Sequence, residues 1–409
     1  MQIATLAQLG AMGLLAAMLP LAMVWMSSDA NKYRKLVWIG VFLTFDLIMF
    51  GAFTRLSDSG LGCPDWPGCY GLANPFQAHD QIRAAEALMP NGPVTLVKAW
   101  IEMTHRYLAM GIGVLIMALM GQAWRQWWKR RRPEFSPWLP TALFFFVCLQ
   151  GAFGAWTVTM KLQPVIVTIH LLLGMGLLAM LTWLGGQQDH ALHPLTRACA
   201  PAPEMRRMRV LAALAALLLA IQIELGGWVS TNYAALACLD FPLCHGTLLP
   251  EMDFEHGFTL WRALGKTAAG HYLPFPALSA IHVVHRSFAL LVFAGIGYTA
   301  CRAWRYRALR TMARAIIAVL VLQACTGVAT IYLNWPLVIA VLHNGGAALL
   351  VLLLTMLNYK AKFQHDIARR TEAAAAAART KTEPATFASQ ANSMTTKPTQ
   401  PPSPARQTP

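Results

Sequence analysis

The chain has 409 residues, of which 56% are hydrophobic and only 12% are charged. Charged residues make up about a quarter of an ordinary soluble domain, so this composition excludes a soluble globular protein and favours a membrane protein. The formal net charge of +15 does not indicate a nucleic-acid partner, because the basic residues cluster between apolar stretches.

Nine apolar stretches follow one another along the chain, each near or above the roughly 18 residues that a membrane-spanning helix needs. The first runs from Ile3 to Met26 with no basic residue before it, so we interpret it as an additional N-terminal helix and not as a signal peptide. The eight core spans are predicted at 36–54, 98–122, 138–158, 163–185, 209–229, 278–301, 312–333 and 336–358. The predicted fold is therefore an all-α integral membrane protein.

The basic clusters lie on alternate connections between these spans. They occur at 32–35, 125–132, 206–209, 302–314 and 360–370. The positive-inside rule places these connections in the cytoplasm and the long segments 56–97 and 231–277 outside. Residues 361–409 contain an Ala run followed by Thr, Pro, Ser and Gln, and we expect them to form a disordered cytoplasmic tail.

The chain contains a tandem repeat. GAFTRLSDSGLGCPDWPGCYG from Gly51 matches GGWVSTNYAALACLDFPLCHG from Gly226, at an offset of 175. Three further blocks match in the same order: EMTHR with HVVHR, QGAFGAWT with QACTGVAT, and TIH with VLH. We therefore expect an N-terminal helix and linker over 1–35 and two four-helix bundles over 36–197 and 205–360, related by a parallel pseudo-twofold axis.

Four histidines lie at one depth within the predicted spans, about 10 Å below the outer surface. They are His105 and His170 in the first half, and His285 and His343 in the second. Two facing imidazoles are a standard pair of axial ligands for haem iron, and bundle interiors build such sites from facing helices. The alternatives are polar helix-packing histidines or a zinc or copper site, although no Cys or carboxylate completes both halves symmetrically.

Glycines follow three of these histidines on the same helices, and we expect them to give a flat macrocycle its clearance. They are Gly111 and Gly113, Gly174 and Gly176, and Gly345 and Gly346.

The halves differ three residues before the first histidine of each pair. Glu102 precedes His105 on the same helix face, whereas His282 precedes His285. A carboxylate at this depth is costly unless it handles protons or stabilises charge, so Glu102 is a candidate catalytic residue in a half that performs chemistry. The alternative is a structural Glu paired with a nearby Arg or Lys.

Arginines near the outer surface are candidate contacts for haem propionates. Arg106 and Arg286 each follow a histidine directly, and Arg55 lies at the end of the first core span. The alternative for these side chains is to reach the lipid headgroups.

Two cysteine pairs, Cys63 with Cys69 and Cys238 with Cys244, lie in the predicted outer segments. Disulfides are expected on the oxidising side of a membrane. We favour two staples that hold loops over the histidine sites; exchange of redox equivalents between the first pair and the first site is the alternative.

With these motifs, and with LHNGG after His343, the chain over residues 36–358 resembles the haem A synthase family, in the form that carries cysteine pairs in its outer loops. The resemblance implies oxidation of a ring methyl of haem O to the formyl group of haem A. It implies that His105 and His170 take the substrate haem, that His285 and His343 ligate a resident haem b, and that Glu102 is the essential carboxylate.

The same resemblance implies a place in a bacterial inner membrane, among lipids and with the cysteine loops outside. The haem O synthase, a farnesyltransferase, would be the upstream partner, terminal oxidase assembly would use the product, and an electron donor is required. A di-haem b-type electron carrier or a haem delivery protein is the alternative, and Glu102 argues against a pure carrier.

Overall fold

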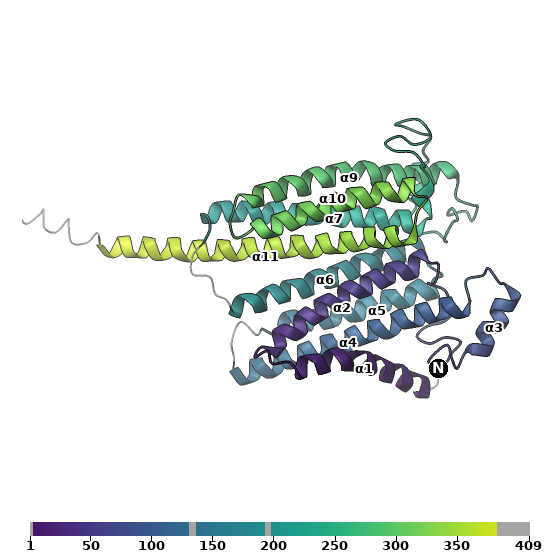
Figure 1. Cartoon of the computed structure of the whole chain (residues 1–409), viewed down its shortest axis with the longest axis horizontal. Coiled ribbons are helices and arrows are strands. Elements are labelled where there is room, and N and C mark those ends of the chain that lie inside the picture. The colour runs from purple at the N-terminus through teal and green to yellow at the C-terminus, as the bar shows by residue number, and fades with distance from the viewer. Residues whose placement is uncertain (1–2, 131–135, 193–197, 383–409) are drawn as a thin grey trace, which may run out of the picture.

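The structure is a computed structural model that describes residues 3–130, 136–192 and 198–382 (Figure 1). Within these ranges, nine helices are long and apolar enough to cross a membrane, which confirms an all-α, multi-pass membrane protein. They are α1 (Ile3–Trp25), α2 (Lys32–Leu56), α4 (Leu96–Arg130), α5 (Trp138–Thr159), α6 (Pro164–Leu192), α7 (Ala202–Thr231), α9 (Phe275–Trp304), α10 (Arg310–Tyr332) and α11 (Leu337–Thr382).

Three short helices lie in the two long connections. They are α3 (His79–Leu88) between α2 and α4, and η2 (Ala234–Leu236) and α8 (Phe254–Gly257) between α7 and α9. The sequence analysis did not predict them. They belong to the end of the molecule that carries the cysteine pairs, which we call the loop end; the opposite end, where α7 begins and α9 ends, is the basic end.

Each predicted span contains a helix, and α1 continues through Pro20. The expectation of a disordered tail from residue 361 is wrong for residues 361–382, because α11 continues to Thr382. Alanine has the highest helix propensity of any residue, and the side chains of Gln364 and Glu372 bond this extension to the start of α7. Residues 383–409 of the predicted tail, and Arg131 and Arg132 of the second basic cluster, lie outside the described residues.

Eight of the nine long helices, all but α1, form two groups of four that lie side by side (Figure 1). In the first bundle, α2 and α5 each pack on both α4 and α6, so α4 and α6 stand diagonally across the bundle. In the second bundle, α7 and α10 each pack on both α9 and α11, so α9 and α11 are the diagonal pair. The two bundles meet where α2 and α6 face α7 and α11.

The main hydrophobic core fills the part of both bundles nearer the basic end. Its fully buried members include Leu119 of α4, Leu181 of α6, Ile296 of α9 and Leu357 of α11. Each of these residues comes later in its helix than the candidate histidine of that helix. The histidines therefore lie between this core and the loops that cover the other end.

Helix α1 packs along α4 through small residues. Gly13 lies against Met110, and Gly111 lies against Ala16, and a Cβ atom added at either glycine would come within 2.9 Å of its neighbour. Small residues allow membrane helices to approach closely, so this contact fixes α1 to the helix that carries His105 and Glu102.

Candidate functional site

Each candidate histidine ring lies against a glycine of a neighbouring helix. A Cβ atom on that glycine would lie 3.0 Å from Nε2 of His105, 3.2 Å from Cε1 of His170, 3.1 Å from Cε1 of His285 and 3.2 Å from Cε1 of His343. Carbon atoms in contact are normally about 3.5–4.0 Å apart, so only glycine leaves the rings these positions. The glycines are Gly51 of α2, Gly154 of α5, Gly226 of α7 and Gly327 of α10.

The helix arrangement leaves room between the two histidines of a bundle. His105 and His170 are carried by the diagonal helices α4 and α6, and His285 and His343 by the diagonal helices α9 and α11. Packed helix axes are about 8–10 Å apart, which makes a bundle diagonal about 11–14 Å. A flat group fits between side chains on diagonal helices more readily than between helices in direct contact.

Five of the six glycines predicted to give this clearance instead pack on side chains of neighbouring helices. Gly111 packs on Ala16, Gly174 on Gln150, Gly176 on Phe146, Gly345 on Met49 and Gly346 on Gln323, while Gly113 faces open space. They serve close helix packing or have no near neighbour. The glycines against the histidine rings were recognisable in the sequence, because Gly51 matches Gly226 and Gly154 matches Gly327 between the repeats.

In the second bundle, polar side chains hold both imidazole rings. Thr326 Oγ1 lies 2.9 Å from Nδ1 of His343, and Gln222 Nε2 lies 3.1 Å from Nδ1 of His285 and donates to the carbonyl oxygen of His285 at 3.1 Å. Such partners fix the orientation of a metal-ligating imidazole and tune its affinity for the metal. Neither residue is among those predicted from the sequence.

In the first bundle, the matching positions are apolar. Leu47 stands where the second bundle has Gln222, and Phe153 stands where it has Thr326. Nδ1 of His170 is buried with no hydrogen-bond partner, and the Phe50 ring stacks on His105 with 6.2 Å between ring centroids. The first pair of imidazoles is therefore held less tightly than the second.

Several buried polar atoms around the histidines have no partner within the described part of the chain. Besides Nδ1 of His170, they are Oε1 of Gln150, Gln222 and Gln323, and Nη1 of Arg286. Unpartnered buried polar atoms are rare in native proteins and indicate a missing water, ion or ligand. Together with the glycines that lie against the rings and the histidines on diagonal helices, these polar atoms fit a haem in each bundle.

The predicted cysteine pairs form disulfides, with Cα–Cα distances of 5.0 Å for Cys63–Cys69 and 4.8 Å for Cys238–Cys244. We call residues 63–72 the first cysteine loop and residues 238–247 the second. All four cysteines are buried. The pairing is confirmed, and the surrounding contacts suit a structural staple.

The two cysteine loops are built alike. The Asp65 carboxylate accepts hydrogen bonds from the backbone N–H groups of Tyr70 (2.7 Å) and Gly71 (2.6 Å). Asp240 accepts from those of His245 (2.9 Å) and Gly246 (2.8 Å). The Gly246 amide, assisted by His245, holds the pKa of Asp240 below its ordinary value.

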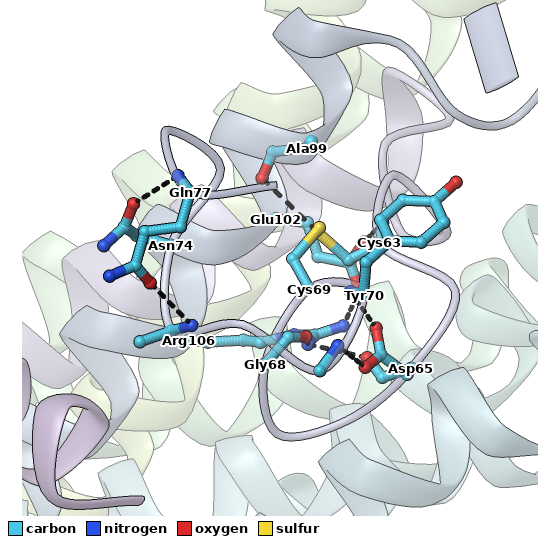
Figure 2. The surroundings of a disulfide bond; sticks show 12 residues. Cys63, Asp65, Gly68, Cys69, Tyr70, Asn74, Gln77, Ala99, Glu102 and Arg106 are labelled. Carbon is cyan, nitrogen blue, oxygen red and sulfur yellow. Dashed lines mark hydrogen bonds and ion pairs between the residues drawn. A yellow bond between two sulfur atoms is a disulfide. The ribbon is translucent and has the colours of Figure 1, made fainter. Parts of the chain in front are cut away.

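Glu102 and Arg106 bind the first cysteine loop to α4 (Figure 2). The buried Glu102 carboxylate accepts a hydrogen bond from the Cys63 N–H at 2.7 Å and forms an ion pair with Arg106. Arg106 Nη1 also donates to the carbonyl oxygens of Asp65 (2.9 Å) and Gly68 (2.6 Å). The alternative of a Glu paired with a nearby Arg is thus present in the structure.

The second loop has the same attachment without the carboxylate. His282 Nδ1 accepts from the Cys238 N–H at 3.3 Å, and Arg286 Nη2 donates to the carbonyl oxygens of Asp240 (2.8 Å) and Leu243 (3.2 Å). Positions 102 and 282 therefore perform the same loop-holding task with different chemistry.

The three arginines predicted to contact propionates differ in whether a terminal nitrogen remains without a hydrogen-bond partner. Both terminal nitrogens of Arg106 have protein partners. Arg55 joins the bundles, because Nη2 donates to the Ser230 carbonyl oxygen (2.8 Å) and Nη1 pairs with Asp58 (3.2 Å). Only Arg286, of these three, keeps a buried terminal nitrogen without a partner in the described chain.

Comparison with known proteins matches residues 34–355 to the family described as cytochrome oxidase assembly protein (COX15-CtaA). The chain is 36% identical to the heme A synthase of Shewanella oneidensis, over 80% of this chain and 96% of that protein. It is 29% identical to the heme A synthase of Rhizorhabdus wittichii (80% and 92%) and 28% identical to that of Caulobacter vibrioides (80% and 95%). The matched family segment begins after α1 and ends within α11.

Proposed function

Because the chain belongs to the COX15-CtaA family of cytochrome oxidase assembly proteins, we propose that it is an oxidoreductase that converts haem O to haem A. The reaction oxidises one ring methyl of haem O to a formyl group. The observation that carries the proposal is a duplicated pair of histidines in which one copy alone has a carboxylate three residues before its first histidine. A pure electron carrier has no need of that asymmetry.

The first bundle is the proposed substrate site. His105 and His170 would hold haem O, and the apolar residues Leu47 and Phe153 leave their rings without the polar partners found in the second bundle. Weaker fixing of the ligands suits a haem that must enter, react and leave. Glu102 is the proposed catalytic carboxylate, placed one helical turn from His105 and held by Arg106 and Cys63.

The second bundle is the proposed site of a resident haem b. His285 and His343 would hold its iron, with Gln222 and Thr326 orienting the rings. The unpartnered Nη1 of Arg286 is a donor for a propionate, for which Arg is well suited. When bound, such a haem supplies one-electron transfer.

The cellular setting follows from the same proposal. The basic connections would face the cytoplasm and the cysteine loops would lie outside a bacterial inner membrane. The haem O synthase would supply the substrate, and terminal oxidase assembly would take the product.

The decisive experiment is pigment analysis of cells that make haem O, with and without this protein. We expect haem A to appear only when the chain is present. Haem bound without any formyl-haem would support the rival di-haem carrier and contradict the proposed reaction.

Variants at position 102 separate loop holding from chemistry. E102Q keeps an oxygen that can accept from the Cys63 N–H, and E102H copies the arrangement of His282 in the second bundle. We expect both variants to retain the first disulfide and bound haem but to lose haem A formation. H282Q is the matched control in the second bundle and should keep oxidation. Wild-type turnover in E102Q would remove Glu102 from the catalytic role.

A further inference from the structure

An open cleft of about 840 Å³ lies at the basic end of the second bundle, between α7, α9 and the extension of α11. Figure 1 shows α11 running well past the ends of its neighbours on this side. Arginines from all three helices line the cleft: Arg206 and Arg207 of α7, Arg302 of α9 and Arg369 of α11. We call this feature the basic cleft.

The wall formed by α11 is held in place by hydrogen bonds to Cys199, just before α7, and to the first residue of α7. The Cys199 N–H donates to Gln364 Oε1 at 2.8 Å, and the Ala202 N–H donates to Glu372 Oε1 at 3.1 Å. Glu372 is the single acidic residue among those that line the cleft, and this bond engages its carboxylate. The basic cleft is therefore a built feature with excess positive charge.

The arginines of the basic cleft have no acidic partner among the described residues. Within residues 3–130, 136–192 and 198–382, none of the four forms an ion pair. Nε of Arg302 is buried and has no hydrogen-bond partner there. A buried guanidinium N–H without a partner is costly, and the unpaired charges of the four arginines favour an anion in the cleft.

The lining changes from basic to apolar one helical turn deeper, about 5.4 Å toward the bilayer. Val210 and Leu211 follow Arg206 and Arg207 by four residues, and Tyr298 precedes Arg302 by four on the same face of α9. Val210 is 53% exposed and Tyr298 is 56% exposed, so both leave surface open to a ligand in the cleft. A ligand that fits both layers has an anionic head and an apolar tail.

We infer that the basic cleft binds an anionic phospholipid. Its phosphate is held by Arg206, Arg302 and Arg369, and the first segment of its acyl chains lies against Val210 and Tyr298. Basic pockets between membrane helices recognise such headgroups, and Arg pairs with phosphate through two parallel hydrogen bonds. Arg369 lies beyond the segment that matches the family, so one wall of the site belongs to the extension of this chain.

The test uses the purified full-length protein with its haem, transferred from detergent to nanodiscs of phosphatidylcholine with or without phosphatidylglycerol. We expect phosphatidylglycerol to raise the unfolding midpoint, because a ligand of the folded state stabilises it by mass action. In R206Q/R369Q, the apparent affinity for phosphatidylglycerol should fall by about tenfold or more. The control R305Q/R307Q removes the same charge from exposed residues outside the cleft and should bind as the wild type does.

The inference would be overturned by equal stabilisation by both lipids, by an unchanged affinity in R206Q/R369Q, or by an equal loss in R305Q/R307Q. Inorganic phosphate added at the same concentration is a further arm, and protection equal to that of the lipid would identify a free anion site and refute the lipid. Should R206Q/R369Q fail to fold, the comparison of the two lipids and phosphate on the wild type still decides. The experiment measures the dependence of stability on lipid and not haem oxidation. A negative result would therefore not contradict the proposed function.

Discussion

Because Gly327 lies against the His343 ring, we make a quantitative prediction for Gly327→Ala. The new Cβ would lie 3.2 Å from Cε1 and 3.8 Å from Nδ1 of His343. Normal carbon contact at about 3.5–4.0 Å requires the ring to retreat by about 0.3–0.8 Å. An imidazole bound to iron cannot follow without strain, and overpacking of this kind costs about 1–3 kcal/mol. Since 1.4 kcal/mol is a factor of ten, we expect haem affinity to fall by about 5- to 150-fold.

The assay is the haem content of the purified protein, together with the rate of haem loss to a scavenger. Gly297→Ala in α9 is the matched control, because its Cβ would meet Leu320 Cδ2 at an ordinary 3.8 Å. Replacing a helix-interior glycine with alanine stabilises the helix by up to about 1 kcal/mol, so haem loss in Gly327→Ala should not come with a lower unfolding temperature of the haem-free protein. Wild-type haem retention in Gly327→Ala would refute the assignment of His343 as an iron ligand.

Three further predictions concern the parts that surround the histidines. Gln222→Leu, which copies the first bundle, should weaken retention of the proposed resident haem by about tenfold, and an unchanged rate of haem loss would show that Gln222 does not orient His285. Removal of residues 1–26 should make the first disulfide easier to reduce than the second, because α1 packs against the first cysteine loop alone; equal reduction of both would contradict this support. The pKa of Asp240 is lowered in the folded protein, so Asp240 stabilises the second cysteine loop above its ordinary pKa of about 3.9, and this stabilisation is lost as the pH falls below that value. We therefore expect the Gly246 amide to exchange its hydrogen faster in acid, and we expect this change to be absent in Asp240→Asn.

The positions of the membrane helices could be read from the sequence because a bilayer offers no other partner for backbone polar groups. A run of apolar residues long enough to span must be helical there, and even Pro20 does not end α1. The repeat blocks identified the histidines for a related reason. Residues that recur at matched depth in two copies, such as His170 and His343, report a shared local structure.

Features decided by contacts between distant segments could not be predicted in the same way. The continuation of α11 depends on Gln364 and Glu372 meeting the start of α7, which no local pattern reveals. The partners of Arg106 likewise depend on how the first cysteine loop folds back over α4. The glycines against the histidine rings lie on other helices, so the match between the two repeats indicates them, whereas closeness to each histidine in the sequence does not.

Positions 102 and 282 together indicate why the first bundle has a carboxylate. His282 accepts the same backbone N–H of the cysteine loop that Glu102 accepts, so holding the loop does not require a charge. A buried carboxylate in a membrane helix is costly, and its ion pair with Arg106 offsets that cost only in part. Arg286 holds its loop through carbonyl oxygens with a histidine in place of the carboxylate, so the arginine does not require one either. The carboxylate of Glu102 therefore has a role that the second bundle does not need. In the proposed function, that role is the oxidation of the substrate haem.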